Sequence, residues 1–249
     1  MSPLLLTAAL LAADPVARDP RLYELRLYTA APGKVDAVVE RFRDAAVPLF
    51  AKHGLTGAGY FVPTPNPTNQ FVVLMAHKDR AARDAGFKGF TADPAWMAAV
   101  SASDAAGKLV AKVDEYFLTC TDYSPAVAVA AQSPARVFEL RMYQSSSGNP
   151  EAINARFRDH TVKLFAKHGM TNLWYWNLAD GTKDTRHDLI YLLAHPSADA
   201  RKKAFGAFGA DPEWKAALTA SEAKAGGPLT TKGGVKYMLL TPTDFSPLK

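Results

Sequence analysis

The chain contains one cysteine, Cys120, among its 249 residues. A single thiol cannot form an intrachain disulfide, and it provides neither a redox pair nor a cysteine cage for zinc. Basic residues slightly outnumber acidic ones, 29 to 24, but they form no runs and belong to no nucleic-acid-binding motif. We therefore expect no nucleic-acid partner.

Long hydrophobic runs are also missing, which argues against a membrane span, because a spanning helix needs about 20 apolar residues. The stretch Leu4–Ala13 is apolar over about ten residues, the length of the apolar core of a signal peptide. We predict that residues 1–20 are a signal peptide and that the protein is exported, to the periplasm or outside the cell. If the stretch is an N-terminal extension instead, the protein is cytoplasmic.

Signatures of common enzyme classes are absent as well. The sequence has no nucleophile elbow, phosphate-binding loop or dinucleotide fingerprint. It has no His-x-x-x-His pair, and His160 and His168 lie about 12 Å apart along a helix, too far to share one ion. We predict neither a metal nor a cofactor.

The dominant feature that is present is an internal repeat. Residues 23–56 recur as residues 138–171, with 18 of 34 positions identical. The match continues with small insertions to the end of the chain, so it defines two units, 21–125 and 136–249, joined by an Ala-rich linker at 126–135. We expect two copies of one fold.

Each unit is predicted to follow the order β-α-β-β-α-β. Tyr23–Tyr28 alternates apolar and polar residues as a strand does, and apolar residues recur at helical spacing from Lys34 to Gly54. Pro48 should kink this helix, whereas Lys163 at the matching position should leave it straighter. The order is that of a ferredoxin-like α+β unit. Two tandem units would pair their bare sheet faces and close one barrel with the helices outside.

Four motifs occur in the same order in both units. In the first unit they are Tyr23–Tyr28, Leu49–Gly54, Asp93–Trp96 and Thr121–Pro125. Together they resemble the NIPSNAP family over nearly all of the chain after residue 20. The resemblance implies a dimeric α+β barrel, here formed within one chain, a fold shared with cofactor-free monooxygenases, small isomerases and haem-binding relatives. The better-known members of the family are mitochondrial proteins linked to vesicle traffic and mitophagy signalling.

One polar row of the first strand is repeated in both units: Glu24, Arg26 and Tyr28, then Glu139, Arg141 and Tyr143. We expect this row to face the barrel interior and make it polar. The arginines could then hold a carboxylate or phosphate by forked hydrogen bonds, with the tyrosines orienting it. Alternatively, each Glu pairs with an Arg in a buried structural network.

The two units differ in their histidines and aromatic residues. The family resemblance implies a His near the end of the first helix; the second unit has His160 there, but the first has Ala45. His160 and His195 are the preferred candidates for a general acid or base, because imidazole titrates near neutrality. The second unit also has Trp174 and Trp176, which either stack on a flat ligand or fill the core.

These features leave two functional hypotheses. The first is a barrel of undefined activity that binds a small molecule or a protein partner. The alternative is a cofactor-independent oxygenase- or isomerase-like enzyme that uses His160, Tyr143 and Trp176 on an aromatic or quinone-like substrate. A single closed barrel and a homo-oligomer of such barrels are both compatible with the sequence. Any site is expected in the second unit.

Overall fold

The computed structural model describes residues 18–146 and 150–249, so the predicted signal segment, residues 1–20, lies outside the described residues except for its last three positions. The first repeat contains β1 (Leu22–Ala30), α1 (Val35–Arg41), the π-helix η1 (Phe42–Ala46), α2 (Val47–Lys52), β2 (Thr56–Pro63), β3 (Gln70–His77), α3 (Arg80–Thr91), α4 (Pro94–Ser103) and β4 (Val110–Cys120). The second contains β5 (Val137–Ser145), α5 (Pro150–Arg156), the π-helix η2 (Phe157–Thr161), α6 (Val162–Lys167), β6 (Thr171–Leu178), β7 (Leu189–His195), α7 (Ala198–Ala210), α8 (Pro212–Ala225) and β8 (Thr230–Pro242).

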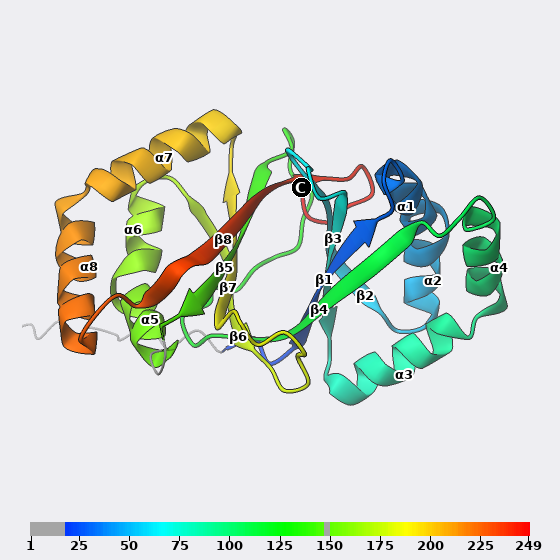
Figure 1. Ribbon diagram of the computed structural model, residues 1–249, viewed down its shortest axis with the longest axis horizontal. Coiled ribbons are helices and arrows are strands. Elements are labelled where there is room, and N and C mark those ends of the chain that lie inside the picture. The colour runs from blue at the N-terminus through cyan, green and yellow to red at the C-terminus, as the bar shows by residue number, and fades with distance from the viewer. Residues whose placement is uncertain (1–17, 147–149) are drawn as a thin grey trace, which may run out of the picture.

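The eight strands close into one barrel in the order β1-β3-β2-β8-β5-β7-β6-β4. All neighbours are antiparallel, and the two halves are joined where β2 pairs with β8 and β4 pairs with β6. The helices of the first repeat cover one end of the molecule and those of the second repeat cover the other (Figure 1). This arrangement confirms the predicted α+β fold of two tandem units in a single barrel.

The interior of the barrel is apolar, so the prediction of a polar lumen is wrong. Tyr23, Leu25 and Leu27 point inward from β1, together with the matching residues of β5. The polar row points outward, toward the helices. Alternation in a strand defines two faces but not which face is inside. The described side chains that fill the lumen are apolar or aromatic, whereas the outer face meets arginines of α3 and α7.

Trp174 and Trp176 account for much of the lumen filling. Their indole rings stack with centroids 5.6 Å apart, and both pack against Tyr23 from the other repeat. Both side chains are fully buried, and a cavity of only about 10 Å³ remains beside Trp176. A flat ligand has no room there, so these tryptophans act as core residues.

The first helix of each repeat is interrupted by a π-helical segment at the same place. These segments, η1 and η2, span matching residues. Because the second repeat has Lys163 where the first has Pro48, this irregularity does not require proline, and a straighter second helix stays a prediction. Such π-segments are often found at functional sites. In the second repeat the segment carries His160.

The repeated motif Thr-Asp-aromatic-Ser-Pro fastens each repeat to the other. Ser124, after β4, accepts a hydrogen bond from the backbone N–H of Tyr175 on β6, and Ser246 accepts one from Tyr60 on β2, both at 3.0 Å. The aromatic residue of each motif packs on that same tyrosine. The reciprocal contacts explain why the motif occurs twice: each copy closes one seam of the barrel.

Candidate functional site

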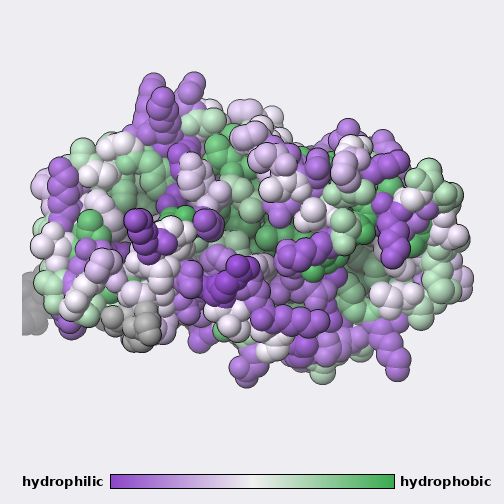
Figure 2. Space-filling view, in the orientation of Figure 1, coloured by the Kyte–Doolittle hydropathy of each residue, from purple (hydrophilic) through white to green (hydrophobic). Residues whose placement is uncertain are grey.

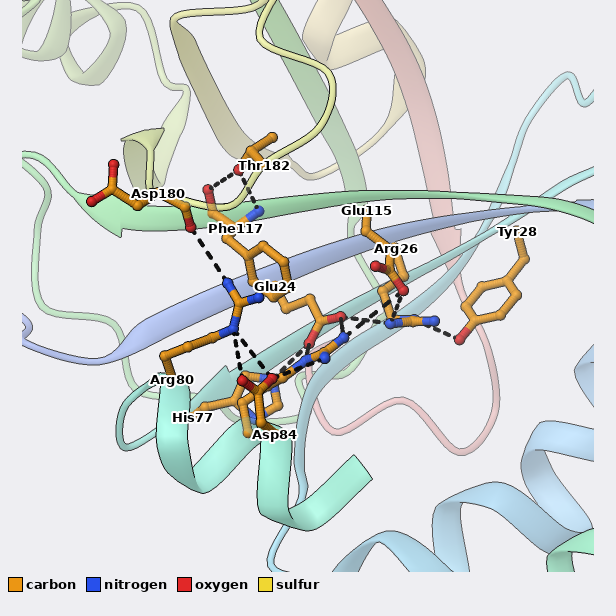
Figure 3. Close-up of polar contacts among 11 residues, drawn as sticks. Glu24, Arg26, Tyr28, His77, Arg80, Asp84, Glu115, Phe117, Asp180 and Thr182 are labelled. Atoms are coloured by element: carbon orange, nitrogen blue, oxygen red, sulfur yellow. Dashed lines mark hydrogen bonds and ion pairs between the residues drawn. The ribbon is translucent and has the colours of Figure 1, made fainter. Parts of the chain in front are cut away.

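A buried ionic cluster lies between β1 and α3 in the first repeat (Figure 3). Glu24, which is fully buried, accepts hydrogen bonds from Arg26 Nη1 (2.6 Å) and from Arg83 Nε and Nη2 (2.9 and 2.7 Å). His77 Nε2 lies 3.0 Å from the same carboxylate. Glu115 on β4 supplies a second carboxylate, 2.5 Å from Arg26 Nη1. Asp84 on α3 adds a third, exposed carboxylate 3.2 Å from Arg83 Nη1, so the carboxylates fully balance the two guanidinium groups.

The second repeat has the same central arrangement with fewer carboxylates. Glu139 accepts hydrogen bonds from Arg141 Nη1 (2.7 Å) and from Arg201 Nε and Nη2 (3.0 and 2.7 Å). His195 Nε2 lies 3.2 Å from it. Tyr237 stands opposite Arg141 where Glu115 stands opposite Arg26. His195, a predicted acid or base, is therefore buried against a glutamate, and the second cluster carries one unbalanced positive charge.

The arginines control the ionisation of both central glutamates. Burial raises the pKa of Glu24, but hydrogen bonds from Arg83 and His77 and the charge of Arg26 outweigh burial and lower that pKa to about 2. The pKa of Glu139 is lowered to about 2 by the corresponding partners. Both glutamates are anions at neutral pH, which fits the predicted structural network.

A separate pocket of about 330 Å³ lies between the α5–η2 segment and α8 in the second repeat. Its lining consists of five alanines and a few polar side chains: Ala152, Ala155, Ala217, Ala220, Ala225, Arg156, Asp159, His160, Ser221 and Lys224. This volume is at the lower end of the range for small-molecule sites. Of the predicted catalytic residues, His160 lines this pocket.

Arg156 is the unusual group in the pocket. It is only 6% exposed, yet its Nε and Nη1 have no hydrogen-bond partner among the described residues. Glu222 lies 3.7 Å from Nη1, too far for a hydrogen bond, and the guanidinium stands 5.4 Å from the ring centroid of Trp214. Burial lowers the pKa of Arg156, but an arginine stays charged in proteins. The buried cation thus has one loosely placed counter-ion, Glu222, which does not hydrogen-bond its Nη1.

The matching arginine of the first repeat, Arg41, also has a buried Nε without a partner among the described residues, but its Nη1 is paired. Arg41, the counterpart of Arg156, donates from Nη1 to Ser103 Oγ (3.1 Å) and to Asp104 Oδ1 (2.9 Å). The pocket around Arg41 is lined by two acidic residues, Glu40 and Asp44, and one cation. The second pocket has two cations and one acid. The charge of the pocket therefore changes sign between the repeats.

The structure separates the other residues that the sequence suggested. Tyr143 is outside the barrel, where it accepts a hydrogen bond from Arg141 and packs on Phe157, whereas Trp176 is inside the lumen. These residues and His160 therefore do not share one cavity. Arg26, Tyr28, Glu139 and Arg141 belong to the ionic clusters. A ligand role for any of them stays a prediction.

Sequence reasoning missed Arg156 as a site residue, although a signal existed. Arg41 and Arg156 match in the repeat, but Glu40 is replaced by Ala155 and Asp104 by Glu222. The described residues contain no group of three His, Cys, Asp or Glu side chains that could bind a metal ion. Within residues 18–146 and 150–249, no helix is long and apolar enough to span a bilayer.

Several solved structures share this fold. A monooxygenase-like protein from Fusobacterium nucleatum is 11% identical, with a TM-score of 0.58, and the match covers 89% of this chain and 92% of that one. A monooxygenase-like protein from Lactobacillus acidophilus is also 11% identical, with a TM-score of 0.55, and the match covers 90% of this chain and 94% of that one. An anthrone oxidase-like protein is 12% identical, with a TM-score of 0.54, and the match covers 93% of this chain and 95% of that one. At these identities the likeness shows the fold alone.

No curated protein sequence matches the chain. A family model, however, matches both repeats, over residues 23–125 and 138–247. The two matched segments cover most of the chain and coincide with the two halves of the barrel, which confirms the resemblance seen in the motifs. The chain belongs to the NIPSNAP family and carries two tandem copies of its domain.

Proposed function

We propose that the protein binds a small organic anion in the pocket between α5–η2 and α8 of the second repeat. The observation that carries this proposal is the buried guanidinium of Arg156, which lines a 330 Å³ cavity and whose Nη1, unlike that of Arg41, has no hydrogen-bond partner among the described residues. Leaving such donors unpaired is costly, and an anion that accepts from them would recover that cost.

The lining of the pocket restricts the ligand further. The alanine side chains give an apolar wall on both helices, while Lys224 and His160 add cationic or hydrogen-bonding capacity. A molecule with one acidic group and a compact apolar body therefore fits better than a sugar or a polyanion. Because Arg presents a fork of donors, carboxylates and phosphates are the groups that it recognises best.

A small ligand is favoured over a protein partner at this surface. Among the described residues, the large apolar side chains that are exposed are Met97, Val129 and Tyr237, and they belong to α4, the linker and β8. Polar and apolar residues are interleaved on the visible face (Figure 2). Protein-binding surfaces usually have a contiguous apolar centre.

The enzymatic alternative now involves fewer of the residues that the sequence suggested. Only His160 of its three residues lines the pocket, so an oxygenase- or isomerase-like reaction would use His160 as the base and Arg156 to hold the substrate. The fold shared with monooxygenase-like proteins supports this alternative only at the level of architecture. Loss of turnover in His160→Ala with binding retained would favour it.

The test uses native mass spectrometry of the purified protein, followed by calorimetric titration with benzoate as the probe. Ala155→Glu places in the second pocket the acid that the first repeat has at Glu40, and it should weaken benzoate binding about tenfold or more. Arg156→Lys should do the same. The matched control, Arg41→Lys, should leave binding unchanged. Equal affinity of Ala155→Glu and the wild type would refute the proposal.

A further inference from the structure

A second unbalanced positive charge, shared by Arg141 on β5 and Arg201 on α7, lies beside the outer face of β8. In the first repeat, Glu115 reaches Arg26 at 2.5 Å and Arg83 at 3.8 Å, with its side chain 33% exposed. Its carboxylate thus closes the ionic cluster from the protein surface. Figure 3 shows Arg26 between this carboxylate, Glu24 and Tyr28.

The second repeat has no carboxylate at this place. Tyr237 occupies the position, and among the described residues Glu139 is the carboxylate that pairs with Arg141 and Arg201. The Nε atom of Arg141 is buried without a hydrogen-bond partner, whereas the Nε of Arg26 donates to a tyrosine hydroxyl at 2.7 Å. The two repeats therefore differ in the hydrogen bonding of the arginine as well as in the missing carboxylate.

Tyr237 covers the cations without neutralising them. Its ring centroid is 4.7 Å from Cζ of Arg201 and 5.4 Å from Cζ of Arg141. The side chain is 55% exposed, which is unusual for a large aromatic residue in this protein. An exposed ring changes rotamer within nanoseconds, so it can move aside or stack on a ligand. Stacking on an aromatic ring and forked hydrogen bonds from arginine are both open to a ligand at this place.

We infer that Arg141, Arg201 and Tyr237 form a binding site for a small aromatic carboxylate on the outer face of β8. The carboxylate takes the position that the Glu115 carboxylate takes in the first repeat, where it accepts from the guanidinium groups. The apolar body of the ligand stacks on the ring of Tyr237. This site is formed by β5, α7 and β8, and it does not depend on the pocket at Arg156.

The key variant is Tyr237→Glu, which supplies the missing carboxylate from within the chain, as the first repeat does. Its matched control is Tyr237→Phe, which keeps the ring and adds no charge. Binding of benzoate is followed by the NMR resonance of the Arg141 Nε–H group, assigned by its loss in Arg141→Lys. Inorganic phosphate serves as a second probe, and Ala155→Glu removes the other proposed site.

In the wild type and in Tyr237→Phe, millimolar benzoate should shift the Arg141 resonance with similar affinity. Tyr237→Glu should bind benzoate about tenfold more weakly or not at all, and it should melt at a higher temperature than the wild type. Ala155→Glu should leave the shift unchanged. Unaltered benzoate affinity in Tyr237→Glu, an Arg141 resonance that does not move, or equal affinity for phosphate would overturn the inference.

Discussion

The internal repeat contains two equivalent buried glutamates, so the effect of removing one negative charge can be measured at two similar sites. Glu24→Gln and Glu139→Gln each replace a fully buried carboxylate by a neutral side chain of the same shape. Each glutamate accepts from two arginines and faces one histidine. The two variants differ in what remains, because Glu115 still neutralises Arg26 in the first repeat.

The expected cost differs for that reason. Removing one partner of a buried ion pair destabilises a protein by about 3–5 kcal/mol. We expect about 4 kcal/mol for Glu139→Gln, because it leaves two guanidinium groups without a carboxylate. At an effective dielectric constant of about 20, opposite charges 4 Å apart attract by about 4 kcal/mol. Glu115 is one-third exposed and retains part of that attraction, so we expect about 2 kcal/mol for Glu24→Gln.

The assay is urea unfolding at neutral pH, followed by the fluorescence of the tryptophans, two of which line the barrel. For a chain of this size these costs correspond to melting temperatures lower by about 12 °C and about 6 °C. Adding Tyr237→Glu to Glu139→Gln should recover about half of the loss, since the new acid faces the same arginines. Equal costs for the two single variants, or no recovery in the double variant, would refute the charge-balance argument.

Three further results are expected. Because the folded pKa of Glu24 and Glu139 is about 2 against an ordinary value of 4.5, both contribute stability that is present above pH 4.5 and lost as pH falls toward 2; urea midpoints that stay constant across this range would contradict it. Trp176→Ala should cost about 3–5 kcal/mol by emptying the lumen, measured by thermal unfolding, and a cost below about 1 kcal/mol would show that the lumen collapses. Ser246→Ala should cost about 1–3 kcal/mol, because it leaves the buried N–H of Tyr60 unpaired, and an unchanged melting temperature would mean that the seam does not need this bond.

The sequence predicted the architecture because the relevant signals are repeated and local. Alternation in β1, helical spacing after Lys34 and the Asp-Pro helix starts all correspond to observed elements. Asp93 and Asp211 cap their helices through the backbone N–H groups of Ala95 and Glu213. Each signal acts within a few residues, so a linear pattern is sufficient to find it.

The direction of the polar row could not be predicted in the same way. Alternation in Tyr23–Tyr28 states that two faces differ, and the closure of the barrel decides which face is enclosed. Arg83 and Arg201, which make the outer face suitable for a buried glutamate, come from helices about 60 residues away in the chain. These distant arginines favour the outward direction of the polar row, and the sequence of the strand alone does not reveal them.

The candidate sites were hidden because they lie in differences between the repeats and not in the shared motifs. The lengthening of Asp104 to Glu222 by one methylene group coincides with a change in the ion-pair distance from 2.9 to 3.7 Å. The replacement of Glu115 by Tyr237 removes a carboxylate altogether. Neither change alters the secondary-structure pattern, so motif comparison passes over both.

A tandem chain can tolerate such imbalances more easily than a dimer of single domains. In a symmetric homodimer, each unpaired arginine would occur twice and its cost would be doubled. Here the first repeat keeps Arg26 and Arg41 paired with its own carboxylates, and the closed barrel unites both halves in one sheet. The balanced half can thus maintain the fold while the second half retains cations that only a ligand would complete, which is why both proposed sites lie in the second repeat.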